Sequence, residues 1–333
     1  MDGSAAVISS QTEAMASKPP APAGRARIFI RRLRGGDEVA HLITLTFAAS
    51  IFLLTVLLVF ELFHNSALPR HKFGWAFFFT RTWDPVFENF GALPFIYGTV
   101  VTSALALLFA VPLGVGAAIF LAELAPPGIS AALTFVIELL AAVPSVIYGL
   151  LGIFILLPVL RTYVEPFLKY TLGFLPLFQG PVFGIGFLAA GVVLAIMVVP
   201  FIISVSREVL LAVPNDQREA ALALGATRWE STWKVVVPYA KAGIMGSIFL
   251  SLARALGETM AVTMVIGNTP QISASLFAPG YSIAAVIASE FTEATGNLHV
   301  QALIELGLVL FLLTILINGL ARVLILATTQ RSG

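Results

Sequence analysis

Long apolar runs separated by short polar stretches dominate this chain. Six runs approach or exceed the roughly 20 residues of helix that a bilayer core requires. We place them at about 40–63, 97–123, 131–158, 183–206, 238–266 and 300–326. The pattern predicts an all-α polytopic membrane protein with six transmembrane helices, in which residues 37–329 form one membrane domain.

A polar tail precedes the first run. Residues 1–24 are rich in Ala, Ser and Pro, and five arginines follow between Arg25 and Arg34. This composition predicts that residues 1–36 are disordered. The first long apolar run begins near Val39, too far along for a signal peptide, so we expect an uncleaved anchor. Nucleic-acid binding by the arginines is an alternative, but the positive-inside rule explains them more simply.

The distribution of lysine and arginine predicts the topology. Thirteen of them fall in the N-terminal tail, the 207–241 segment and the C-terminal tail, which six spans would place on one side of the membrane. The loops on the other side hold five. Because cytoplasmic loops carry the excess of positive charge, both termini and the 207–241 segment are expected to be cytoplasmic.

Composition excludes several other classes of protein. The chain is 58% apolar and 11% charged, with a mean hydropathy of +0.95, which excludes a soluble domain. Zero cysteines exclude a disulfide framework, and the four histidines fit no metal spacing. No Gly-Lys dipeptide occurs, so the chain has no phosphate-binding P-loop. We expect no cofactor and no catalytic site.

Two predicted outer loops have unusual compositions. The first is crowded with aromatic residues, which suggests a loop lying on the membrane surface. They are Phe73, Trp75, Phe77, Phe78, Phe79, Trp83, Phe87 and Phe90. The second loop, 267–299, has no Lys or Arg and contains an apolar run, 283–288, too short to span. That run is either a re-entrant or surface helix of an outer gate, or part of a plain loop.

A polar island lies between the fourth and fifth apolar runs. Asn215 or Asp216 can cap a helix there, and Gly225 supplies a stop. Thr227 and Glu230 have the spacing of a capping box, which restarts the helix. A helix of roughly ten residues is marginal alone in water, so this one is expected to dock against another surface.

The same segment resembles the EAA signature of ABC importer permeases. The match consists of Glu219, Ala220, Ala221, Gly225, Val235, Val237 and Pro238. The resemblance implies a type I importer permease architecture. In that family the segment is a cytoplasmic coupling helix, between spans four and five, that inserts into a cleft on a separate ATP-hydrolysing subunit. The resemblance therefore assigns ATPase coupling to Asp216, Glu219, Ala220, Ala221 and Gly225.

Two charged residues interrupt the fifth apolar run. Arg254 lies thirteen residues after Lys241, about 20 Å along a helix, and therefore near the bilayer midplane. Glu258 follows four residues later. A charge at this depth costs at least roughly 2.5–3.5 kcal/mol, so it should face protein or a pathway. Either the two residues neutralise each other as an i,i+4 pair, or Arg254 attracts an anionic substrate while Glu258 holds it in place.

The stretch around these charges resembles the permeases of phosphate (Pst) importers. The matching segments are 254–262, 267–272 and 278–281, with 144–149 and 111–116 earlier in the chain. Segments 267–272 and 278–281 are similar to the C-type subunit of these importers. The resemblance covers roughly 95–325 and implies a bacterial inner-membrane subunit for inorganic phosphate. It also implies a homologous A-type permease, two ATP-binding subunits and an extracytoplasmic phosphate-binding protein as partners. Another oxyanion such as molybdate or sulfate, a secondary transporter, and a receptor or scaffold remain alternatives.

Other polar residues within the apolar runs are assigned structural roles. Thr99, Thr102 and Ser103 are expected to hydrogen-bond neighbouring helices rather than line a pathway. Glu138 and Glu305 are expected to be interfacial residues or hydrogen-bond partners between helices.

Overall fold

The computed structural model describes residues 37–329, with side chains from Ala40 to Val323. Its regular structure within this range is helical, apart from an isolated bridge between Asp84 and Asn89. The predicted tail, 1–36, lies outside the described residues. Of the described residues, those up to Phe60 form one compact unit, and those from Glu61 onward form a second. The first unit contains most of helix α3 (Asp37–His64).

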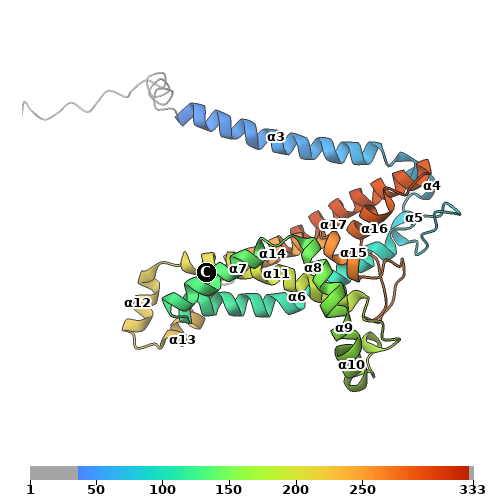
Figure 1. Ribbon diagram of the computed structural model, residues 1–333. Coiled ribbons are helices and arrows are strands. Elements are labelled where there is room, and N and C mark those ends of the chain that lie inside the picture. Colours follow the sequence, from blue (N-terminus) through green and yellow to red (C-terminus); the bar gives the residue numbers. More distant parts are fainter. Residues whose placement is uncertain (1–36, 330–333) are drawn as a thin grey trace, which may run out of the picture. The chain divides into compact units, whose positions relative to one another are not determined.

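The second unit contains the remaining helices (Figure 1). Short π-helical turns interrupt several of them. Their bounds are α4 (Ala67–Phe73), α5 (Ala76–Phe79), α6 (Leu93–Ile119), α7 (Pro127–Ala141), α8 (Ser145–Leu151), α9 (Leu157–Val159), α10 (Glu165–Leu172), α11 (Phe187–Leu211), α12 (Asn215–Ala223), α13 (Arg228–Ser231), α14 (Val237–Leu256), α15 (Met260–Val265), α16 (Ile283–Glu290) and α17 (Asn297–Thr329).

Six described segments are long and apolar enough to cross a membrane, as the sequence predicts. The chain is therefore a multi-pass membrane protein. The spanning segments are Ala40–His64, Leu93–Leu124, Ser145–Leu172, Phe187–Leu211, Arg228–Leu256 and Asn297–Val323.

The predicted bounds of the third span are wrong. In place of a continuous helix over 131–158, α7 ends at Ala141, and Ser145 begins a separate helical segment that reaches Leu172. Pro144 explains the break, because its ring disfavours helical backbone at the preceding residue and its φ of −58° suits the start of a helix. Apolar composition alone joined the two helices into one predicted span.

The fifth span is also discontinuous, which corrects the single helix predicted over 238–266. Helical structure begins earlier, at Arg228, and ends at Leu256. A short helix, α15, resumes at Met260. Gly257 ends the longer helix, since glycine is a poor helix former. The break falls between the two charged residues that the sequence singles out.

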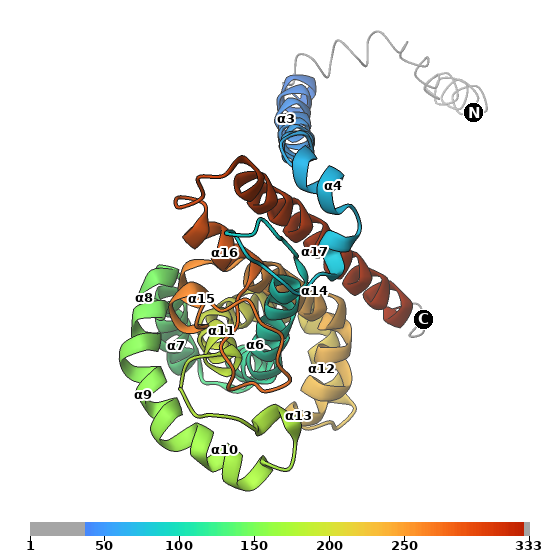
Figure 2. The ribbon, with the colours of Figure 1, turned by 90° about the vertical axis from the view of Figure 1, so that its right-hand side faces the viewer.

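Helix α11 forms the centre of the second unit. It packs against α6, α7, α14 and α15, and Figure 2 shows these helices around it. Small residues permit this close packing: a Cβ added at Gly114 of α6 would lie 2.7 Å from Ile202, and one at Gly191 of α11 would lie 2.6 Å from Leu105. Close approach through small residues is the usual mode of helix association in membranes.

The glycines of α6 provide a test of this packing. A Cβ at Gly98 would collide with the backbone carbonyl of Tyr281, which has little freedom to move. We expect Gly98→Ala to destabilise the protein by about 1–3 kcal/mol through overpacking. Gly116→Ala is the matched control, because a Cβ there meets no atom within 4 Å. Thermal unfolding in detergent measures both; equal melting temperatures for the two variants would contradict the packing.

The aromatic loop after α3 contributes to a second core. Phe77 and Phe90 are fully buried and Trp83 is 8% exposed, packed with residues of α16 and α17. The prediction of a loop lying on the membrane surface is therefore wrong for these three rings. Trp75 and Phe87 differ, with 82% and 81% exposure. The composition of the loop could not distinguish the buried rings from the exposed ones. The helices that bury Phe77, Trp83 and Phe90 lie far away in the sequence.

The apolar run at 283–288 forms most of α16, so the plain-loop alternative is wrong. Its first four residues are buried, and Ser282 caps it by accepting a hydrogen bond from the Ala285 amide. Thr99 of α6 accepts another from the Ile283 amide at 2.9 Å. These bonds satisfy amides that would otherwise lack partners at a buried helix end. A role in an outer gate stays a prediction.

Candidate coupling segment and substrate pathway

Helix α12 lies at one end of the second unit, and α16 lies toward the other (Figure 1). Gly225 ends helix α12, as predicted, and its φ of +87° disfavours residues other than glycine. The Gly225 amide donates to the Leu222 carbonyl at 2.9 Å, and the Ala226 amide donates to that of Ala221 at 3.1 Å. This pair of bonds is the Schellman motif, which turns the chain sharply after a helix.

Of the two predicted caps, one is correct. Thr227 and Glu230 form a capping box, in which Thr227 Oγ1 accepts from the Glu230 amide and Glu230 Oε2 accepts from the Thr227 amide. The prediction for Asn215 or Asp216 is wrong. Pro214 precedes the first turn, and no side chain caps it. Proline fixes the entry angle of the chain in place of a side-chain cap.

The predicted coupling residues form a surface around the bend at Gly225. Asp216, Glu219 and Ala220 are exposed, and Ala221 is buried. Ala220, Ala221 and Gly225 line a cavity of about 490 Å³. Leu224 lines it too and is 90% exposed, a position typical of a residue that a partner covers. The fold therefore brings four of the five predicted residues to an accessible face.

The two charged residues of the fifth span do not pair. Among the ion pairs of the described chain, none joins Arg254 to Glu258, so the predicted i,i+4 neutralisation is wrong. Helix α14 ends at Leu256, which removes the helical spacing on which the prediction rested. Glu258 Oε1 instead accepts a hydrogen bond from the Ala261 amide at 3.2 Å, at the beginning of α15.

Arg254 lies in the last turn of α14 and is exposed on this chain. Its guanidinium carbon is 5.7 Å from the centre of the Phe201 ring, within range of a cation–π contact. An arginine left to face lipid at this depth would be costly, so its side chain requires a polar partner or a water-filled path.

A family model for the inner membrane component of binding-protein-dependent transport systems matches residues 110–329. The chain belongs to this family. The phosphate transport system permease protein PstC of Mesorhizobium japonicum is 47% identical over 310 residues, 91% of this chain and 94% of its own. PstC of Pasteurella multocida is 48% identical over 291 residues, 86% and 91% of the two chains. A probable PstC of Methanocaldococcus jannaschii is 37% identical over 292 residues, 86% and 92%.

Solved structures of ABC transporters share the fold of this permease. A bacterial transporter involved in the import of the acidic polysaccharide alginate aligns with a TM-score of 0.55 at 18% identity, covering 89% of this chain and 98% of its own. The MetNI methionine transporter, in an inward-facing conformation, aligns with a TM-score of 0.52 at 17% identity, covering 74% and 99%. The predicted type I importer fold is confirmed.

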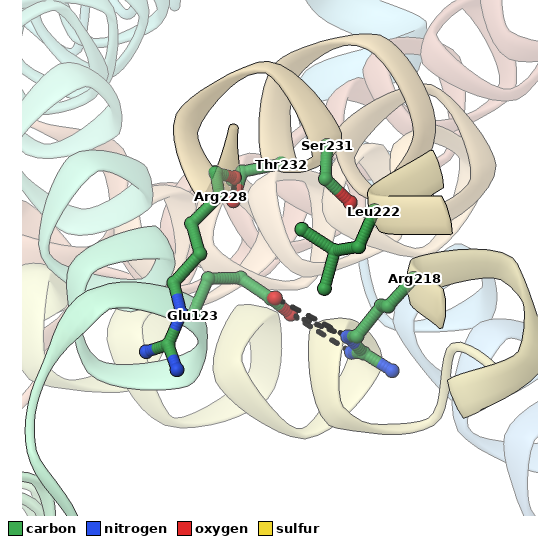
Figure 3. A pocket seen from close by; sticks show the side chains of 6 residues that line it. All are labelled: Glu123, Arg218, Leu222, Arg228, Ser231 and Thr232. Carbon is green, nitrogen blue, oxygen red and sulfur yellow. Dashed lines mark hydrogen bonds and ion pairs between the residues drawn. The ribbon is translucent and has the colours of Figure 1, made fainter. Parts of the chain in front are cut away.

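Sequence reasoning missed a contact between α12 and the end of the second span. Arg218 of the permease donates to Glu123, with the closest N–O distance at 2.8 Å (Figure 3). Both line a cavity of about 210 Å³ together with Arg228 of α13. Arg218 contributed only to the charge count, because Glu123 is 95 positions away. The one signal in the sequence was the position of Arg218, a charged residue directly before the EAA signature.

The remaining polar residues of the spans are structural in part. Thr99 and Thr102 donate to carbonyls of their own helix, at 2.8 Å in each case, and Thr99 also joins α6 to α16. Ser103 Oγ is buried without a hydrogen-bond partner in the described chain. Glu305 is 2% exposed, and its Oε2 has no hydrogen-bond partner in the described chain, so its role as an interfacial residue or as a hydrogen-bond partner between helices stays a prediction. Glu138 is exposed, which leaves its prediction open.

Proposed function

We propose that this permease is a membrane subunit of an ATP-driven importer of inorganic phosphate and forms half of its translocation pathway. The observation that carries the proposal is the exposed surface at Glu219, Leu224 and Gly225, in a chain whose curated relatives are named for phosphate transport. ATP is hydrolysed by separate subunits, which bind that surface.

The proposed complex contains two permease halves, this chain and a homologous A-type subunit. Two ATP-binding subunits lie on the cytoplasmic side, and an extracytoplasmic phosphate-binding protein delivers the anion. The complex resides in the bacterial inner membrane with both termini of this chain in the cytoplasm. The excess of Lys and Arg in the terminal and 207–241 segments supports this orientation.

Transport follows from coupled movement. ATP binding closes the two ATP-binding subunits and moves the docked segment 216–226. The bend at Gly225 and the helical segment from Arg228 to Leu256 pass this displacement to the fifth span. Arg254, at the inner end of that segment, meets the phosphate anion when the two halves open outward. Its guanidinium presents planar donors that suit phosphate oxygens.

Labelled phosphate uptake tests the proposal. A strain lacking this chain is expected to lose high-affinity uptake and to regain it when the chain is restored. ATP-binding subunits unable to hydrolyse ATP serve as the control and are expected to prevent uptake. Uptake that persists with them would instead indicate a secondary transporter. Preferential uptake of labelled molybdate or sulfate would assign another oxyanion.

A further inference from the structure

We propose that Arg218 and Glu123 form a clamp that passes the movement of α12 to the second and fourth spans. The proposal rests on the coupling role given to α12 above and deepens it. In the proposed function, the movement of α12 reaches the fifth span through the bend at Gly225. The clamp adds a direct connection to α6 and α11, the two helices at the centre of the fold. Arg218 is a positioning residue in this mechanism.

The hydrogen bonds of Arg218 use all five of its N–H groups. Nε donates to both oxygens of Glu123, at 3.3 and 3.2 Å, and Nη2 donates to Glu123 Oε1 at 2.8 Å. The second Nη2 hydrogen reaches the Leu210 carbonyl at 2.8 Å. Nη1 donates to the Val213 carbonyl and to Asn215 Oδ1. One side chain therefore contacts the end of the second span, the end of α11 and the start of α12.

Two of the partners of Arg218, Glu123 and Leu210, belong to different membrane spans. Glu123 lies in the π-helical turn Phe120–Leu124 that ends the second span. Leu210 is near the end of α11, and its carbonyl accepts from Arg218 as well as from the Val213 amide at 3.2 Å. A cation at this end also interacts favourably with the helix dipole. The side chains of Glu123 and Arg218 are 9% and 18% exposed, so water screens their attraction weakly.

Apolar packing holds α12 in place poorly. Within this helix, which the structure describes completely, Ala221 is the one buried residue. Pro214 and Gly225 join it to its neighbours through sharp turns. A helix held in this way would pivot when a partner pushes it, and its movement would be lost. The Arg218–Glu123 clamp supplies the missing rigid connection.

Arginine is required because of its geometry as well as its charge. Lysine has three donors on a single nitrogen and cannot bind the carboxylate side-on while also reaching the Leu210 and Val213 carbonyls. Arg218→Lys therefore keeps the charge and removes the rigid connection. Glu123→Gln keeps the shape of the acceptor and removes its charge.

The experiment measures phosphate taken up per ATP hydrolysed in the reconstituted complex with its binding protein. We expect Arg218→Lys and Glu123→Gln to assemble and hydrolyse ATP, while this ratio falls about tenfold, within the usual range of coupling between sites. The double variant should lose no more than either single one, because both act through one contact. Arg207→Lys is the matched control: its side chain is 19% exposed, and it pairs with neighbouring Glu208.

Each outcome decides the proposal. A normal ratio in both single variants overturns it, as does an equal fall in uptake and ATP hydrolysis, which indicates a merely structural pair. If Arg218→Lys fails to assemble, Glu123→Asp replaces it, and a reduced ratio is again expected; a normal ratio overturns the clamp. Wild-type complex that takes up no phosphate would instead refute the proposed function, independently of the clamp.

Discussion

Arg254→Gln is expected to reduce phosphate uptake by about 10- to 100-fold while the complex still assembles, since a hydrogen bond to a charged group contributes roughly 1.5–3 kcal/mol. The structure strengthens this expectation. Among the described residues no ion pair joins Glu258 to Arg254, and the Glu258 carboxylate accepts a hydrogen bond from the Ala261 amide. The guanidinium, exposed on this chain at the end of α14, therefore remains available to an anion.

Two variants separate a substrate role from a general effect of charge. Lys241→Gln removes a positive charge from the exposed face of the same helix, and normal uptake is expected. Glu258→Gln should also have a small effect, since an amide oxygen can still accept from the Ala261 amide. Labelled phosphate uptake, normalised to the amount of assembled complex, measures all three. Normal uptake by assembled Arg254→Gln would exclude Arg254 from the pathway.

Changes at Gly225 and Glu219 are expected to separate the permease from its ATP-binding subunits. Gly225→Trp and Gly225→Ala share the cost of a positive φ, on the order of 1 kcal/mol. They differ in bulk, and a Cβ at this position meets no atom of this chain within 4 Å. A loss of association in Gly225→Trp that exceeds the loss in Gly225→Ala therefore reports the partner's surface. Co-purification of the subunits and stimulated ATP hydrolysis measure it.

Charge reversal provides an independent test of the same surface. Glu219→Lys is expected to weaken association and ATPase stimulation by at least about tenfold, the effect typical of breaking a charged contact at an interface. Glu293→Lys is the matched control, because Glu293 is exposed and follows α16, which lies toward the end of the second unit opposite α12 (Figure 1). If Glu219→Lys and Gly225→Trp both leave association and ATPase stimulation unchanged, α12 is not the docking site.

The sequence predicted the bend after α12 and the capping box that follows it, because both signals are local. Gly225 requires a positive φ, and the Thr227–Glu230 capping box acts over four residues, so neither depends on distant packing. The number of spans was predictable for a similar reason, since a bilayer demands a minimum apolar length. Their bounds were less so, because apolar composition extends across Pro144 and Gly257, where the backbone breaks.

The sequence by itself determined a six-span membrane protein and located the bend at Gly225. Tertiary structure decided which charges act together. Arg254 and Glu258 are four residues apart, yet the break after Leu256 separates their roles. Arg218 and Glu123 are 95 positions apart and share three hydrogen bonds. Spacing along a chain predicts contact within one continuous helix, and only the packing of different helices brings distant residues together.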